Sequence, residues 1–150
     1  MSTRRTLLGL GAAALALAAC SGAGTGAAPE ISIENAWVRP PAGGRDIGAA
    51  YLVIHNTGGQ DTLLGASSPL ADHMQMHISK MDGDMMTMRE EKSLVIPAHF
   101  TITYAPGGRH LMMFGVKSGL KAGDKVPLTL HFERFGDIST IATVGGAAPS

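Results

Sequence analysis

Methionine and histidine side chains cluster in the middle of this 150-residue chain. Eight of its nine methionines lie between positions 74 and 113, in the stretches ADHMQMHISKMDGDMMTMR (71–89) and RHLMMF (109–114). Thioether sulfur is a soft, uncharged ligand that favours Cu(I), and imidazole also binds copper. Zinc sites instead use thiolate, imidazole and carboxylate. The two stretches therefore indicate a possible site for a soft metal ion, provided that the fold brings them together.

The first stretch is typical of a β-hairpin. Asp82-Gly83 is a strong signal for a two-residue type I′ turn. With these residues as the turn, His77 is predicted to lie directly opposite Met88. Directly opposed residues project from the same face, with Cβ atoms about 4.5–5.5 Å apart. A slip of one residue would move one of the two side chains to the other face, so this prediction depends on the register.

The second stretch places another histidine and methionine on a common face. In a strand, His110 and Met112 are two residues apart and point the same way, whereas Leu111 and Met113 point into the core. Pro106-Gly107 suits a type II turn that would begin this strand. Each stretch thus offers one imidazole and one thioether on a common face. The residue pattern alone, however, does not show that the two strands are neighbours in the sheet.

Core packing is the competing explanation for the methionine excess. Methionine fills irregular cores well, and we expect Met74, Met76 and Met113 to be buried. His55, His99 and His131 are expected at the surface or at strand edges. A blue-copper electron-transfer site needs a cysteine thiolate. Cys20 is the only cysteine of the chain and precedes the folded part, so an electron-transfer site of that type is not expected.

The N-terminal segment has the pattern of an export signal. Arg4-Arg5 precedes an apolar run over 7–19 that is too short to span a bilayer comfortably. The string Leu17-Ala18-Ala19-Cys20 resembles a bacterial lipobox, which predicts lipidation of Cys20 and attachment to the membrane. The arginine pair also loosely resembles a twin-arginine signal, so the export route stays open. We expect a signal peptide over 1–20, a flexible tether over 21–30, a folded domain over 31–144 and a flexible tail over 145–150.

Charge gives no reason to expect a nucleic-acid partner. The chain has 12 basic and 12 acidic residues, and loss of Arg4 and Arg5 with the signal would leave a slight negative excess.

The folded part reads as an all-β domain. Short alternating or apolar runs recur between Gly and Pro turn signals, and this is typical of an antiparallel sandwich or small barrel. Leu128, Leu130 and Phe132 show the alternation most plainly. The predicted strands are 31–38, 49–55, 62–67, 73–79, 85–90, 100–104, 110–116, 126–135 and 139–144.

The spacing of the four candidate ligands resembles that of a known family. His77, Met88, His110 and Met112 match H-x10-M-x21-H-x-M, the motif of the periplasmic copper chaperones written PCu(A)C. Further similar segments are NAWVR (35–39), GAAYL (48–52) with Asn56, DTLL (61–64), IPA (96–98) and PGGRHLM (106–112). Ala98-His99 departs from the family, in which Gly is frequent at this place.

The resemblance implies a cupredoxin-like, Greek-key sandwich or barrel that binds Cu(I) through His77, Met88, His110 and Met112. It also implies delivery of copper toward the binuclear centre in the copper-bearing subunit of cytochrome c oxidase, alongside Sco-type copper proteins. We expect a periplasmic, membrane-anchored monomer with a single copper site. Whether His73 or Met76 assists the site stays open.

Other functions remain as alternatives. The same site would suit a copper storage or resistance protein, and the β fold alone would suit an Ig-like interaction module without metal. An enzyme is not expected, because the folded part has no nucleophile elbow, no paired acid/base carboxylates and no phosphate-cradling loop.

Overall fold

The predicted all-β class is confirmed. The computed structural model describes residues 26–146, so the predicted signal peptide with Cys20, residues 21–25 and residues 147–150 lie outside the described residues. Within 26–146 no helix is long and apolar enough to cross a membrane. The strands are β1 (Ile31–Arg39), β2 (Gly48–Asn56), β3 (Asp61–Ser67), β4 (His73–Asp82), β5 (Met85–Glu91), β6 (Leu94–Ile96), β7 (Phe100–Tyr104), β8 (Arg109–Phe114), β9 (Lys125–Phe132) and β10 (Asp137–Val144).

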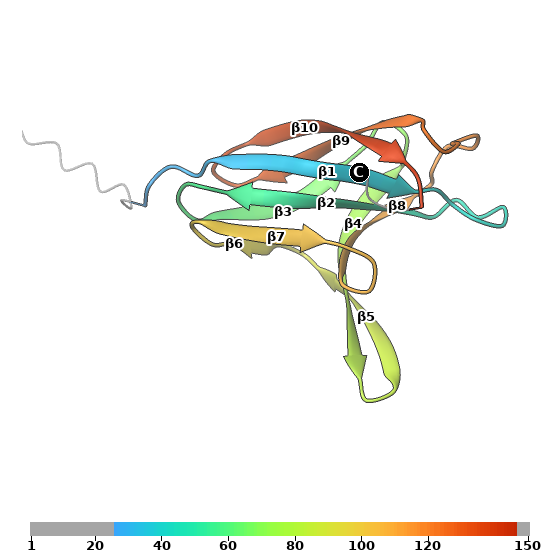
Figure 1. Ribbon diagram of the computed structural model, residues 1–150, viewed down its shortest axis with the longest axis horizontal. Coiled ribbons are helices and arrows are strands. Elements are labelled where there is room, and N and C mark those ends of the chain that lie inside the picture. Colours follow the sequence, from blue (N-terminus) through green and yellow to red (C-terminus); the bar gives the residue numbers. More distant parts are fainter. Residues whose placement is uncertain (1–25, 147–150) are drawn as a thin grey trace, which may run out of the picture.

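All ten strands belong to one folded-over sheet. The strand order is β5-β4-β8-β7-β2-β1-β10-β9-β3-β6, and β8 also pairs with β2. Most pairs are antiparallel, whereas β1–β10 and β7–β8 are parallel. The sheet wraps into a layered body from which the tip of the β4–β5 hairpin projects (Figure 1).

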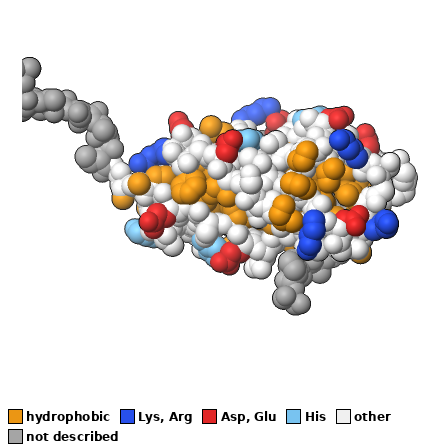
Figure 2. Space-filling view, turned by 90° about the horizontal axis from the view of Figure 1, so that it is seen from above, with side chains coloured by type: hydrophobic (Ala, Val, Ile, Leu, Met, Phe, Trp, Pro, Cys, Tyr) orange, Lys and Arg blue, Asp and Glu red, His pale blue; other side chains and the backbone are white. Residues whose placement is uncertain are grey.

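A single hydrophobic core fills the space between the layers. Leu128, Leu130 and Phe132 of β9 are buried as their alternation predicts, and Met76, Leu111 and Met113 bring β4 and β8 into the same core. Because side chains alternate along a strand, the residues adjacent to these, such as Gln75 and His77 of β4 and His110 and Met112 of β8, lie on the opposite face. The outer surface over β1, β9 and β10 has two groups of hydrophobic side chains, with charges of both signs around them (Figure 2).

Turn geometry explains where the strand boundaries agree with the sequence and where they differ. Gly107 has φ 82° and the Gly108 N–H donates to the Ala105 carbonyl, which confirms the predicted type II turn. The strand predicted over 126–135 ends at Phe132, because the Asp61 carboxylate accepts hydrogen bonds from the backbone N–H groups of Arg134 and Phe135. The short strand β6 was not predicted, since three residues are too few to show alternation.

The described part of the predicted tether lies against the domain. Arg134 donates hydrogen bonds to the carbonyls of Gly26 and Ala27, and Gly59 N–H donates to Ala28. His99 has φ 53°, a left-handed backbone that favours Gly. This conformation accounts for the Gly frequent at that place in the resembling family.

Candidate metal centre

The central finding is that β4 and β8 are direct neighbours. They pair antiparallel, with His77 opposite His110 and Gln75 opposite Met112. Since directly opposed residues share a face, both histidines and Met112 project from the same side of the sheet. The core residues Met76 and Leu111 project from the other side. The fold therefore supplies the adjacency that the sequence alone could not.

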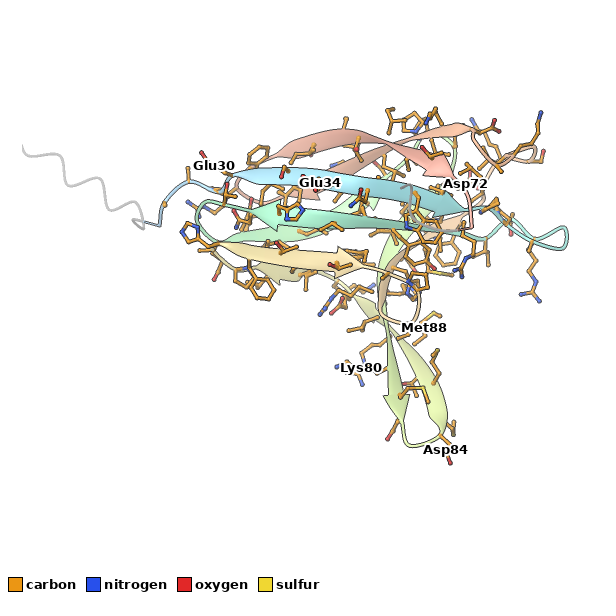
Figure 3. All side chains as sticks on the ribbon, in the orientation of Figure 1. Glu30, Glu34, Asp72, Lys80, Asp84 and Met88 are labelled. Carbon is orange, nitrogen blue, oxygen red and sulfur yellow. The ribbon has the colours of Figure 1, made fainter. Side chains whose placement is uncertain are left out.

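The register of the hairpin differs from the predicted one by two residues. The turn lies at Gly83-Asp84, Met88 is opposite Ser79, and His77 is opposite Glu90. Only Gly83 of the two turn residues has a positive φ, 62°, which fits a type II′ turn with Gly in the first central position rather than type I′. A shift of two keeps every side chain on its face. Met88 is thus a diagonal neighbour of His77, and it lies where the hairpin leaves the body (Figure 3).

The two imidazole rings are close enough to share one metal ion. Their centroids are 5.7 Å apart and the ring planes are tilted by 51°. Two imidazoles that bind one ion through ring nitrogens at about 2.0 Å have centroids within about 6 Å of each other. The separation of the two rings is therefore compatible with both of them binding one ion.

The orientation of His110 is set by the loop before β8. Its Nδ1 donates a hydrogen bond of 3.1 Å to the Gly108 carbonyl, which also accepts the backbone N–H of Ser79. This bond leaves the lone pair on Nε2, which is buried and has no protein partner. A buried polar atom without a partner costs about 1–3 kcal/mol. Binding of a metal ion at Nε2 would remove that cost.

His77 is oriented by Gln75, its neighbour along the same face. Its Nε2 lies 3.0 Å from Gln75 Oε1 and donates to it, so the lone pair falls on Nδ1, which is buried and unpartnered. Burial and then the nearby His110 lower the pKa of His77, and Glu90 partly opposes them. His77 therefore stays in the neutral, metal-binding form to a lower pH than an exposed histidine.

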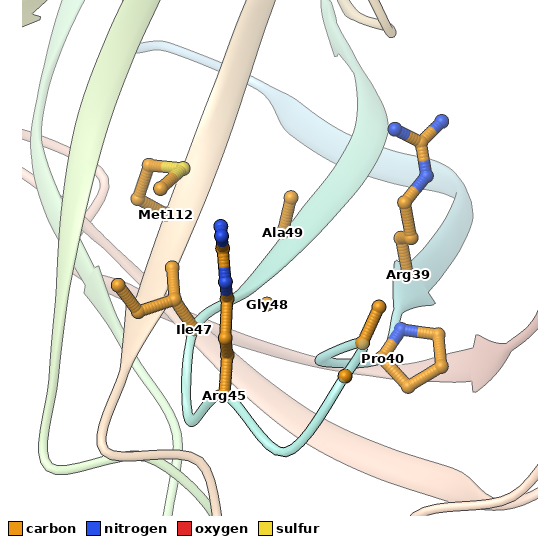
Figure 4. A pocket seen from close by; sticks show the side chains of 9 residues that line it. Arg39, Pro40, Arg45, Ile47, Gly48, Ala49 and Met112 are labelled. Carbon is orange, nitrogen blue, oxygen red and sulfur yellow. The ribbon is translucent and has the colours of Figure 1, made fainter.

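The two thioethers differ in exposure. Met88 is 56% exposed, whereas Met112 is half-buried. Met112 also lines an open pocket of about 490 Å³ together with Arg39, Arg45 and Ile47 (Figure 4). The candidate centre thus reaches the protein surface, with the exposed side chain of Met88 at its outer edge.

The other candidate residues take different places. Met76 is buried on the core face, away from the imidazoles, and therefore packs rather than assists. His73 lies on the ligand-bearing face but is stacked on Phe114, with ring centroids 4.7 Å apart. His55 and His131 make surface hydrogen bonds to Glu34 and Asp137 respectively, as expected.

Gln75 and the Gly108 carbonyl are the functional groups that sequence reasoning missed. Gln75 could have been found, because it lies two residues before His77 and so on the same face. The role of Gly108 depends on the turn geometry. Among the described residues, no group of three or more His, Cys, Asp and Glu side chains is placed to hold a metal ion. A metal site here would therefore combine two imidazole nitrogens with thioether sulfur, a donor set that suits a soft ion.

Solved copper-protein domains share this architecture. The copper-bound PCuAC domain from PmoF2 is 27% identical and covers 78% of this chain and 93% of that domain, with a TM-score of 0.67. The solution structure of CuI-DR1885 from Deinococcus radiodurans is 31% identical over 84% of this chain and 85% of that one, with a TM-score of 0.64. These similarities confirm the cupredoxin-like fold.

The sequence relatives are lipoproteins by description. "Putative lipoprotein Lxx21020" of Leifsonia xyli subsp. xyli is 39% identical over 128 residues, which are 84% of this chain and 76% of that protein. A family model described as "Putative lipoprotein LpqE-like" matches residues 31–144. Its bounds are those predicted for the folded domain, and its description agrees with the lipoprotein signal that the string 17–20 predicts. The chain belongs to the LpqE-like family, and its fold is that of the copper-binding PCuAC domains.

Proposed function

We propose that this protein is an extracytoplasmic Cu(I) chaperone that binds one ion through His77, Met88, His110 and Met112. The observation that carries the proposal is the pair of buried ring nitrogens, His77 Nδ1 and His110 Nε2, that lack protein partners. In each ring, a hydrogen bond donated by the other nitrogen fixes the orientation of the imidazole and leaves the lone pair on the unpartnered nitrogen. Metal-binding histidines are oriented in this way by outer hydrogen bonds. The similarity to copper-bound PCuAC domains supports the choice of metal.

The donor set favours Cu(I) over Cu(II). Thioethers are soft ligands, whereas Cu(II) prefers tetragonal nitrogen and oxygen donors. Four neutral ligands would leave one positive charge on a bound Cu(I). The high exposure of Met88 then suits an ion that is passed on to another protein. These features support a carrier rather than an enzyme.

Cytochrome c oxidase is the recipient that we propose, at its binuclear copper centre and alongside Sco-type copper proteins. This step rests on the resemblance of the ligand spacing to that of the periplasmic chaperones. The protein would act at the outer face of the membrane as a monomer held by a lipid on Cys20. A storage or resistance role with the same site is the second candidate.

Removal of single ligands tests the site. We expect the wild-type protein to bind one Cu(I) in competition with a chromophoric chelator under anaerobic, reducing conditions. His110→Ala and Met88→Leu should both bind far more weakly, whereas Met85→Leu, on the other face of the hairpin, should bind as the wild type does. Unchanged affinity in both ligand variants would refute the proposal. Tighter binding of Cu(II) than of Cu(I) would refute the argument from thioethers.

Deletion of the gene separates the physiological roles. Loss of oxidase activity at low copper, restored by added copper, is expected of a delivery protein. Sensitivity to excess copper without an oxidase defect would instead indicate storage. An interaction module would show no rise in melting temperature with Cu(I), which stabilises the native state of a protein that binds it.

A further inference from the structure

The projecting tip of the β4–β5 hairpin carries a second group of methionines. Pairing between β4 and β8 ends at Ile78, so the hairpin beyond Ser79 is a two-stranded ribbon outside the body (Figures 1 and 3). Met81, Met86 and Met88 are 63%, 60% and 56% exposed there. Such a ribbon is marginally stable by itself, and it buries none of these three apolar side chains well.

Register places the three thioethers on one face. Met81 is directly opposite Met86, and Met88 is opposite Ser79, the next residue of β4 on that face. Directly opposed Cβ atoms are about 4.5–5.5 Å apart and diagonal ones about 7–8 Å, within reach of long side chains. Continuing inward, the same face carries His77. Met88 therefore lies between Met81 and Met86 on its outer side and the imidazole pair on its inner side.

The opposite face of the ribbon has a different character. Lys80, Asp82 and Arg89 lie there together with Met85, by the same register. The thioether face of the ribbon thus carries no basic side chain that would repel a cation, whereas at its inner end Glu90 lies opposite His77 and is paired with Lys92, with 2.7 Å between Lys92 Nζ and Glu90 Oε1. This segregation gives a monovalent cation one favourable side of the ribbon.

The apolar residues of the hairpin tip are all of one type. From Ser79 to Glu91 every apolar side chain is methionine, with no Leu, Ile, Val or aromatic residue. If the tip only bound a partner protein through apolar contacts, leucine would supply a similar apolar area. Only a thioether also supplies a soft lone pair that can bind a metal ion.

We propose that Met81, Met86 and Met88 form an outer, three-thioether site for Cu(I) that loads the inner site. Met88 is shared, so an ion bound by three sulfurs can exchange Met81 and Met86 for the imidazoles without leaving the protein. The loading step rests on the proposed function, whereas the outer site itself does not. The site binds soft monovalent ions, and Ag(I) serves as its redox-inert probe.

The test uses Met methyl groups labelled with 13C in the His77→Gln/His110→Gln variant, which lacks the inner imidazoles. On titration with Ag(I), the methyl signals of Met81, Met86 and Met88 should shift together and saturate, while that of Met85 stays in place. Adding Met81→Leu/Met86→Leu should abolish the Met88 shift, and adding Met85→Leu should not. Because His110 is buried, its replacement could prevent folding, and the signal of the core residue Met113 reports whether the double variant is folded. If the double variant does not fold, the same titration is done with the single variant His77→Gln.

Absence of shifts at Met81 and Met86 in excess Ag(I) would overturn the outer site, as would equal shifts of all exposed methionines. Persistence of the Met88 shift after Met81→Leu/Met86→Leu would overturn it too. In the wild-type protein, the Met112 signal reports the inner site separately. A silent Met112 with responsive Met81 and Met86 would refute the proposed function and leave the outer site standing.

Discussion

Gln75 offers a sharp test of how the proposed metal centre is organised, because it orients the proposed ligand His77 without being a ligand itself. Its Oε1 accepts the only protein hydrogen bond found for the His77 ring within the described residues, at 3.0 Å. Gln75→Leu keeps the size and removes the acceptor. A neutral hydrogen bond contributes about 1 kcal/mol, a factor of about five in a binding constant. Loss of ring orientation adds to this, and outer-ligand substitutions cost about 10–100-fold in metal affinity. We expect Cu(I) affinity to fall about tenfold, the lower end of that range.

The assay combines affinity with the tautomer of His77. Competition with a chromophoric chelator measures Cu(I) affinity, and long-range 1H–15N correlations of the imidazole show which nitrogen carries the proton. In the wild-type protein the proton should be on Nε2. Gln75→Glu is the matched control, because its carboxylate still accepts the hydrogen bond and should retain the affinity. Gln75 is half-buried, so unfolding by urea should change little in either variant.

Two results would refute this reasoning. Equal Cu(I) affinity in Gln75→Leu and the wild type would mean that the hydrogen bond does not prepare the ligand. Equal weakening in Gln75→Glu would mean that the amide acts through packing or charge instead of through acceptance of the Nε2 proton.

Four further predictions rest on burial and charge. The folded protein resists protonation of His77, so its free energy of unfolding should decrease as the pH falls through about 6.5, where the unfolded histidine takes up a proton; urea titrations should show less of this decrease in His77→Gln. Met76→Ala, at a core position that is 3% exposed, should cost about 2–5 kcal/mol in the same assay. Met81→Ala on the exposed hairpin should cost under about 0.5 kcal/mol. Peroxide should oxidise Met88 before the half-buried Met112, as measured by peptide mass spectrometry, and Cu(I) binding should weaken in step with the oxidation of Met88.

The fold class was predictable because alternation survives in most strands. Leu128, Leu130 and Phe132 are buried as their spacing indicates. Boundaries were less predictable, because they depend on groups far away in sequence. The end of β9 is an example, since Asp61 binds backbone N–H groups at Arg134 and Phe135 across the fold.

The sequence predicted which candidate side chains share a face of their strand, but it did not predict which strands are neighbours. Parity along each strand correctly grouped His110 with Met112, and it grouped His77 with Met88 even though the turn lies one residue later than predicted. Moving a two-residue turn by one position changes the register by two, so it leaves faces unchanged. No local pattern, however, makes β4 and β8 adjacent. That adjacency depends on the order of the whole sheet.

Separation of the two faces of β4 and β8 explains how a metal centre can coexist with a stable fold. Met76, Leu111 and Met113 pack the core from one side, while the unpartnered nitrogens of His77 and His110 lie on the other. Arg109 and Glu91 hold β8 to the end of β5 through two hydrogen bonds of 3.0 and 3.2 Å. The root of the hairpin is therefore fixed, whereas its tip contributes little to the core. The proposed ligand Met88, on the exposed ribbon, could then move to bind or release an ion without disturbing the packing that keeps the imidazoles in place.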